Sequence, residues 1–126
     1  MTAKTILVVD DSKLARMAMT RVLGALRPEW IRIEAPNAEE AMAHVASAGP
    51  DVAVIDYNMP GSDGLSLARQ ISEQRPGMPI AIISANFQQE VMDRAAAVGA
   101  TFLAKPITEP ALRTFIEAAE KRMAGD

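Results

Sequence analysis

The chain has 126 residues, a length that suits one packed domain, because single hydrophobic cores typically span about 100 to 150 residues. Its formal net charge of −3 and its 4% aromatic content argue against a nucleic-acid binder, which normally needs a basic surface or aromatic stacking faces. The chain contains no cysteine, which excludes disulfides and thiolate chemistry.

Five short apolar runs, each rich in β-branched residues, predict five β-strands. The first run is cut off by Asp10 and is too short for the core of a signal peptide or for a membrane span. We therefore expect a cytoplasmic protein. The predicted strands are Thr5–Val9, Ile31–Ile33, Val52–Ile55, Ile80–Ile83 and Thr101–Ala104.

A segment with helical periodicity follows each predicted strand. The second helix has the weakest apolar stripe but a clear start, since Asn37 can cap it and Glu40 can reach back. Gly49-Pro50 and Gly99 mark helix ends, and Pro110 suits a first turn. The expected apolar stripes of the other four helices are Ala15, Met19, Val22 and Leu26; Leu65, Ala68 and Ile71; Val91, Ala95 and Val98; and Leu112, Phe115, Ile116, Ala119 and Met123.

This alternation predicts an α/β fold with a parallel sheet covered by helices on both faces. The second strand region, Trp30 to Glu34, alternates apolar and polar residues, as an edge strand with one wetter face would. An edge position for this strand suits a doubly wound, flavodoxin-like (βα)5 fold with strand order 2-1-3-4-5. We expect residues 1–126 to form one domain, with no output domain after Met123.

Polar side chains collect at the carboxyl ends of the predicted strands, where parallel sheets bind their ligands. Asp10 and Asp11 follow the first strand, Asp56 ends the third, Ser84 ends the fourth and Lys105 follows the fifth. Three converging carboxylates repel one another, and oxygen ligands of this kind suit Mg²⁺. Asp56 is the best candidate nucleophile, because it alone lies in a rigid apolar strand, and aspartyl phosphates are established covalent intermediates.

Structural interpretations of the same residues remain open at this point. Asp10 and Asp11 could cap a helix and interact with its dipole. Asp56 and Lys105 could form a structural ion pair, although perturbed buried carboxylates more often mark functional sites.

Four segments together resemble the signature segments of bacterial two-component response regulator receiver domains, of the single-domain kind found in chemotaxis. They occur in the family's order, at the ends of the expected strands, and the resemblance covers the whole chain. The segments are ILVVDDS (Ile6–Ser12), VIDYNMPGSDG (Val54–Gly64), IISA (Ile82–Ala85) and FLAKP (Phe102–Pro106).

The resemblance implies a role for each residue of the site. Asp56 would be the phosphoacceptor and would bind Mg²⁺ directly together with Asp11, while Asp10 would act through a water molecule and Asn58 would contribute its backbone carbonyl. Lys105 would pair with the phosphoryl group.

Two further positions would transmit the signal. Ser84 would swing its hydroxyl towards the phosphoryl group, and Phe102 would be the aromatic switch. Threonine is commoner in the family where this chain has Ser84, and Phe102 lacks the hydroxyl that a tyrosine could offer a partner. We also expect the Lys105–Pro106 bond to be cis.

The function implied is a phosphorylation-dependent signalling switch in a two-component phosphorelay, phosphorylated by a sensor histidine kinase or a histidine phosphotransferase. It would catalyse only its own phosphorylation and dephosphorylation, and would signal to a protein effector through the fourth helix, fifth strand and fifth helix. We expect no nucleic-acid or membrane partner, and a monomer or weak dimer. The alternatives are a phosphorelay intermediate or phosphate sink and, more remotely, a Mg²⁺ phosphohydrolase of the haloacid dehalogenase type.

Overall fold

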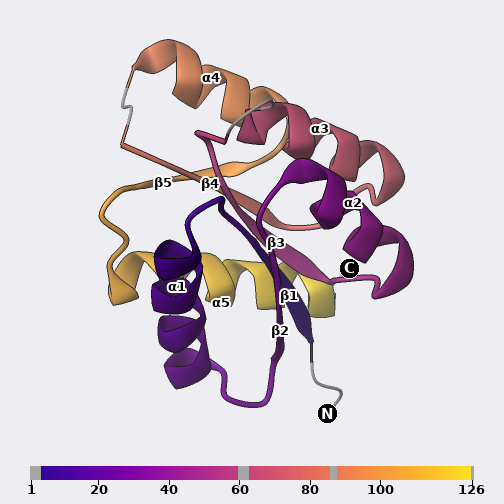
Figure 1. The fold of residues 1–126 in the computed structure, drawn as a ribbon, viewed down its shortest axis with the longest axis vertical. Coiled ribbons are helices and arrows are strands. Elements are labelled where there is room, and N and C mark those ends of the chain that lie inside the picture. The colour runs from indigo at the N-terminus through magenta and orange to yellow at the C-terminus, as the bar shows by residue number, and fades with distance from the viewer. Residues whose placement is uncertain (1–3, 60–62, 86–87, 126) are drawn as a thin grey trace.

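The computed structural model describes residues 4–59, 63–85 and 88–125. In these residues five strands alternate with five helices (Figure 1). In chain order they are β1 (Thr5–Val9), α1 (Lys13–Leu26), β2 (Ile31–Ala35), α2 (Ala38–Ser47), β3 (Val52–Asp56), α3 (Gly64–Gln74), β4 (Ile80–Ser84), α4 (Gln89–Ala97), β5 (Thr101–Ala104) and α5 (Glu109–Gly125).

The strands form one parallel sheet in the order β2-β1-β3-β4-β5, as the sequence predicted. The predicted strand ranges are confirmed, but β2, β3 and β4 run one or two residues further than expected. Asp56 and Ser84 are the last residues of β3 and β4, in agreement with their expected place at the carboxyl ends of these strands. The edge position of β2 is confirmed, and its Ile31 is 56% exposed.

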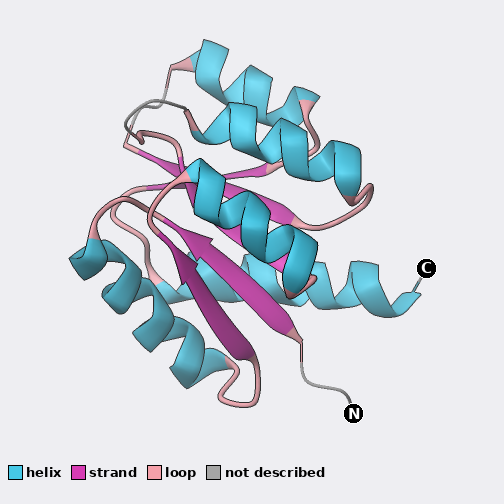
Figure 2. Cartoon of the chain, turned by 45° about the vertical axis from the view of Figure 1, so that its right-hand side comes forward, coloured by secondary structure: helices cyan, strands magenta, loops and turns pink. Residues whose placement is uncertain are grey.

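Two helical layers enclose the sheet (Figure 2). Successive side chains of a strand point to opposite faces, so Ile6 and Val8 of β1 pack with α1 and α5, whereas Leu7 and Val9 pack with α2, α3 and α4. Each face buries its own aliphatic cluster. This division explains why the central strands are apolar along their whole length.

The apolar stripes predicted for α3 and α5 are confirmed at their central positions, whereas the stripe of α1 differs. In α1 the buried residues are Met19 and Leu23, while Val22 and Leu26 are partly buried at the edge of the core. The expected spacing selected a neighbouring face of the helix, because leucine and valine lie side by side in this segment and periodicity alone does not separate them.

Side-chain caps mark the starts of four helices, and in α5 the Thr108 hydroxyl accepts the Ala111 N–H at 3.3 Å. Asn37 caps α2 by accepting the Glu40 N–H at 2.8 Å, as expected. The Glu40 carboxylate reaches the Asn37 side-chain amide at 3.3 Å, rather than closing the box on the backbone N–H. Ser12 caps α1 and Asp63 caps α3, neither of which was predicted.

The predicted helix ends are also confirmed. Gly49 and Gly99 follow α2 and α4 with φ values of +57° and +76°, a region that favours glycine. The residue types of Asn58–Gly61 also predict a turn, and we expect the segment Ser84–Phe87 to move towards a bound phosphoryl group. Residues 60–62, 86 and 87, on which parts of these predictions fall, lie outside the described residues. Within the described part of the chain, no helix has the length and apolar character needed to cross a bilayer.

Candidate functional site

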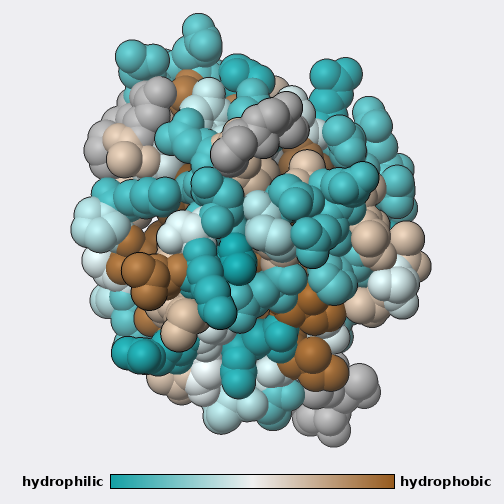
Figure 3. Space-filling model, in the orientation of Figure 1, coloured by the Kyte–Doolittle hydropathy of each residue, from teal (hydrophilic) through white to brown (hydrophobic). Residues whose placement is uncertain are grey.

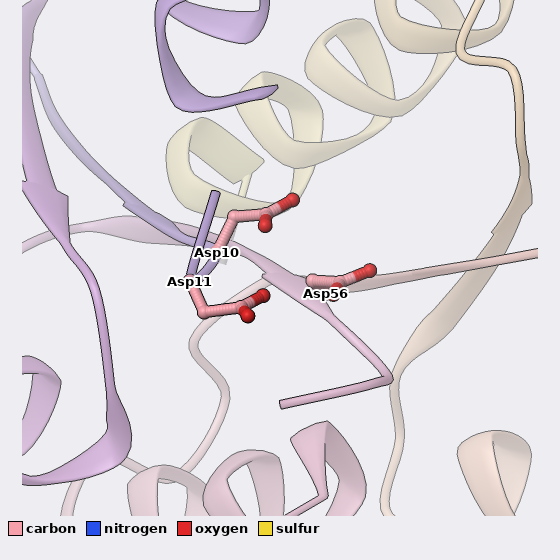
Figure 4. A group of neighbouring side chains, drawn as sticks. All are labelled: Asp10, Asp11 and Asp56. Carbon is pink, nitrogen blue, oxygen red and sulfur yellow. The ribbon is translucent and has the colours of Figure 1, made fainter. Parts of the chain in front are cut away.

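Three carboxylates meet at the carboxyl edge of the sheet, where the chain order of the strands reverses between β1 and β3. Asp10 and Asp11 directly follow β1, and Asp56 ends β3, so two neighbouring parallel strands deliver them to the same place. One oxygen from each lies within 4.8 Å of the others. Figure 4 shows the three side chains extending to the same side. The predicted convergence is therefore observed.

Asp56 is the buried member of this group, with 4% of its surface exposed. Its Oδ1 lies 2.7 Å from the Lys105 ammonium nitrogen, which is an ion-pair distance. The same oxygen is buried and has no hydrogen-bond partner of acceptable geometry among the described residues. Asp56 thus has a nearby positive charge but retains capacity to bind a further electrophile or cation.

Burial and charge both act on the groups around Asp56. Burial alone would lower the pKa of Lys105, but contact with Asp56 and the charges of Asp10 and Asp11 outweigh it, so the pKa of Lys105 is raised and the ammonium stays charged. Burial raises the pKa of Asp10, and the neighbouring charge of Asp56 adds to this rise, although the Ser12 N–H opposes it. One ammonium facing three carboxylates leaves the cluster with excess negative charge.

Two contacts that sequence analysis missed hold Asp10, one at its side chain and one at its backbone carbonyl. The Ser12 N–H donates to Asp10 Oδ1 at 2.9 Å, and Arg16 Nη1 donates to the Asp10 carbonyl at 2.6 Å. Arg16 Nε also donates to Glu34 at 2.9 Å, which ties the start of α1 to β2. The helix-cap interpretation of Asp10 and Asp11 is wrong, because Ser12 Oγ accepts the Ala15 N–H and caps α1 itself.

Gly64, also missed by sequence analysis, brings the start of α3 against the end of β3. Its N–H donates to the Tyr57 carbonyl at 2.8 Å. A Cβ atom at Gly64 would collide with the backbone carbonyl oxygen of Asp56 and crowd Ile55. Glycine is therefore required for this close approach, which fixes the chain on both sides of the loop that follows Asp56.

Asp63 joins that loop to two helices. Its carboxylate accepts the Ser66 N–H at 2.8 Å, and its Oδ2 lies 3.5 Å from Arg94 of α4. Burial alone would raise the pKa of Asp63, but the Ser66 hydrogen bonds and the charge of Arg94 outweigh it and lower the pKa. The signal was available in the sequence, because an aspartate just before an apolar helical stripe, here the one that starts at Leu65, predicts a cap.

The remaining predicted residues lie around the same edge. Ser84 is fully buried at the end of β4, and its carbonyl accepts the Lys105 N–H at 3.0 Å, which carries the lysine towards Asp56. Asn58 is exposed two residues after Asp56. Phe102 is half-buried in β5, where its register partner is Ile82 of β4. This pair lies further from the acidic group than the carboxyl ends of the two strands do. The Lys105–Pro106 bond is cis, as predicted.

Comparison with known proteins agrees with this geometry. Residues 6–117 match the family described as the response regulator receiver domain. The chain is 33% identical over 120 residues to the positive alginate biosynthesis regulatory protein of Pseudomonas aeruginosa, a match covering 92% of this chain and 47% of the relative. It is 34% identical over 125 residues to a protein-glutamate methylesterase/protein-glutamine glutaminase of Nitrosomonas europaea, covering 96% of this chain and 34% of the relative.

Solved structures show the same fold. The chemotaxis protein CheY4 of Vibrio cholerae superposes with a TM-score of 0.85 at 26% identity, over 94% of this chain and 99% of that one. A CheY-like receiver domain protein of Methanospirillum hungatei gives a TM-score of 0.89 at 21% identity, over 99% of this chain and 100% of that one. The chain spans less than half the length of the two curated relatives described above but almost all of these receiver structures.

Proposed function

This chain belongs to the response regulator receiver family, and on that premise we propose that it is a phosphorylation-dependent signalling switch whose phosphoacceptor is Asp56. The receiver assignment itself makes it a component of two-component signal transduction.

The observation that carries the proposal is the environment of Asp56. Its carboxylate is held at the end of a buried strand, beside one ammonium and two further carboxylates. A nucleophile in an open loop would have to be ordered in each reaction, whereas β3 holds this oxygen in place beforehand. The buried Oδ1, which lacks a hydrogen-bond partner of acceptable geometry among the described residues, suits attack on phosphorus.

The residues present fit a Mg²⁺ ion. Asp11 and Asp56 would bind it directly, Asn58 would contribute its backbone carbonyl, and Asp10 would act through water, an all-oxygen set of the kind that Mg²⁺ prefers. The excess negative charge of the acidic group and the buried oxygen of Asp56 support this fit. When bound, the ion would neutralise charge that develops on the transferred phosphoryl group.

The chain's own residues do the remaining work. Asp56, the last residue of β3, attacks phosphorus. Its neighbours Asp10 and Asp11 lie beyond the end of β1, outside the rigid part of the sheet. Lys105, whose raised pKa keeps it charged, moves from pairing with the Asp56 carboxylate to pairing with a phosphoryl oxygen. Ser84, buried at the end of β4, offers its hydroxyl to a second phosphoryl oxygen.

We place the output on the surface formed by α4, β5 and α5. Ser84 and Phe102 lie on adjacent strands, β4 and β5, so a movement at the site can reach this surface through paired backbone. Met92 of α4 is 37% exposed there, and a flexible thioether suits an adaptable contact. A sensor histidine kinase or histidine phosphotransferase would supply the phosphoryl group, and a protein effector would read this surface.

The relatives carry other activities in longer proteins, including the methylesterase named above. We propose that the receiver unit itself catalyses only its own phosphorylation and dephosphorylation, in the cytoplasm. The relay and phosphate-sink alternatives use the same chemistry. The phosphohydrolase alternative gains no support, because the family match and the strand order are those of a receiver.

Mass spectrometry of the intact protein tests the proposal. Incubation with acetyl phosphate and Mg²⁺ should add one phosphoryl group to the wild type, and Asp56→Asn should abolish the addition because an amide is not a comparable nucleophile. Asp51→Asn, which changes a carboxylate at the opposite edge of the sheet, is the matched control and should be labelled like the wild type. Undiminished labelling of Asp56→Asn would assign the chemistry to another residue.

A further inference from the structure

Arg16, in the first turn of α1, contacts two other parts of the chain beside the acidic group. Its Nη1 donates to the Asp10 carbonyl at 2.6 Å, and its Nε donates to Glu34 of β2 at 2.9 Å. Only 13% of its side chain is exposed. Figure 3, in the orientation of Figure 1, shows hydrophilic residues gathered in this region between α1 and β2. The guanidinium is therefore held from two sides.

The carbonyl that Arg16 holds belongs to the peptide group between Asp10 and Asp11. This group is planar, so its oxygen and the Cα atoms of both aspartates lie close to one plane. A donor that fixes the oxygen therefore limits rotation of the whole unit, and with it the point from which the Asp11 side chain starts. Figure 4 shows the side chains of both aspartates extending to the same side as that of Asp56.

Two other contacts hold the neighbouring parts of this segment. The Asp10 N–H donates to the Ala35 carbonyl at 3.1 Å, and the Ser12 N–H donates to Asp10 Oδ1 at 2.9 Å. They fix the peptide before Asp10 and the Asp10 side chain, whereas Arg16 fixes the peptide that leads to Asp11.

The hold on this peptide opposes a repulsion. The carboxylates of Asp10, Asp11 and Asp56 each place one oxygen within 4.8 Å of the others. Like charges at this separation repel one another. Asp56 is fixed in β3, so the repulsion would displace the two aspartates that lie beyond the end of β1.

We propose that Arg16 is a positioning residue that presents Asp10 and Asp11 to Mg²⁺, with Glu34 keeping the guanidinium in place. The inference rests on the proposed function, because it presupposes that the acidic group takes this ion. The ion pair of Arg16 and Glu34 carries no net charge. Its effect on the ion is therefore one of geometry.

Geometry and charge predict opposite effects of removing Arg16. A guanidinium that acted on the ion through its own charge would repel it, so its loss would tighten Mg²⁺ binding. A guanidinium that holds the ligands in place lowers the cost of assembling them, so its loss would weaken binding. Loss of a residue that orients metal ligands typically lowers metal affinity by about 10- to 100-fold. We expect the lower end, about tenfold, because β3 holds Asp56 independently.

Titration with MgCl₂ at constant ionic strength, followed by the amide chemical shifts of Asp11 and Tyr57, measures the dissociation constant of the ion. In Arg16→Met this constant should rise about tenfold. In Arg16→Lys it should rise less, because an ammonium keeps the charge but lacks the fork that reaches both acceptors. Arg21→Met, which removes an exposed arginine of the same helix, should bind the ion like the wild type.

Phosphorylation by acetyl phosphate separates positioning from a defect in the chemical step. In Arg16→Met the rate at low Mg²⁺ should fall by the same factor as the affinity, and saturating Mg²⁺ should restore it towards the wild-type rate. The amide spectra of the titration also report folding. If Arg16→Met is partly unfolded, Arg16→Lys carries the test, because an effect of charge alone would leave its dissociation constant at the wild-type value.

In a folded variant of Arg16, a dissociation constant equal to or below that of the wild type would overturn the inference. Arg16 would then serve only to link α1 to β2. A reduced rate that saturating Mg²⁺ does not restore would also overturn it. Absence of Mg²⁺ binding by the wild type would instead contradict the proposed function.

Discussion

Asp56 occupies a position where a charged side chain is costly without compensation. It is 4% exposed in a strand of otherwise aliphatic residues, and Lys105 is the cation that faces it. Breaking a buried pair by removing one partner leaves an uncompensated charge, which destabilises more than the intact pair stabilises. The pairing therefore compensates the charge of the buried carboxylate, at some cost in stability.

Lys105→Met should lower the free energy of unfolding by about 1 to 3 kcal/mol in Mg²⁺-free buffer, a discounted range because the lysine side chain is 38% exposed. Added Mg²⁺ should restore part of the loss, since the ion would take over the missing positive charge. Urea unfolding with and without Mg²⁺ measures both effects. Lys121→Met, at an exposed lysine of α5, should lose little stability and gain little from the ion. Equal responses of the two variants would refute this explanation.

At the scale of elements, two devices hold the helices in place around the sheet. Arg27, at the end of α1, donates from Nε and Nη2 to the two carboxylate oxygens of Glu120 on α5, both at 2.7 Å. This two-bond pair joins the helices that cover one face. On the other face, Gly64 lets α3 begin in contact with the end of β3. Each of these two interactions holds a helix in the position that the geometry of the site requires.

The Arg27 pair predicts a pH dependence. Its hydrogen bonds lower the pKa of Glu120 in the folded state, although burial opposes this. A depressed pKa contributes stability that is present above the unfolded pKa of about 4.3 and is lost as pH falls through the folded pKa. Glu120→Gln should therefore cost up to about 1 kcal/mol at pH 7, because the pair is partly exposed, and the difference from wild type should shrink below about pH 4.3.

Thermal or urea unfolding at a series of pH values provides the measurement. Glu117→Gln serves as the control, because Glu117 is an exposed carboxylate on the same helix. A stability difference for Glu120→Gln that persists undiminished at acid pH would show that the side chain acts through packing rather than charge.

Gly64→Ala should destabilise the protein by about 1 to 3 kcal/mol, because the added methyl group overlaps the Asp56 carbonyl oxygen and backbone must shift to make room. The same shift should slow phosphorylation by acetyl phosphate, measured by intact mass. Gly24→Ala is the matched control, since its new methyl group meets only the movable end of the Arg32 side chain. Equal stability of the two variants would contradict the required close approach.

At the scale of the whole molecule, α4 links the proposed output surface to the loop after β3. Val91 and Ala95 are its buried residues, and Arg94 lies 3.5 Å from Asp63. A helix with few buried apolar residues shifts at a lower free energy than one with many. A phosphoryl group beside Ser84 can then select among conformations that already exist, by contacts it makes better in one of them.

Beryllofluoride with Mg²⁺, a phosphoryl mimic, should change amide chemical shifts over α4, β5 and α5 as well as at the site. Ser84→Ala should still accept a phosphoryl group at Asp56 yet show a weaker response at that surface, because the hydroxyl that reports the phosphoryl group is gone. Phe102→Ala should accept it and lose effector binding. Perturbations limited to the site, or spread over α2 instead, would rule out the proposed surface.

The sequence by itself determined the strand order, the edge position of β2 and the meeting of Asp10, Asp11 and Asp56. The alternation of β and α segments is a local property of the sequence, and the rule that ligands bind at the carboxyl ends of parallel strands depends only on topology. Only the tertiary structure decided three other features. They are the hydrogen bond from Arg16 to the Asp10 carbonyl, the contact of Gly64 with Asp56, and an apolar hollow beside Lys105. Each depends on the side of a helix that faces its neighbour and on the distance between backbones, which hydrophobic spacing does not specify.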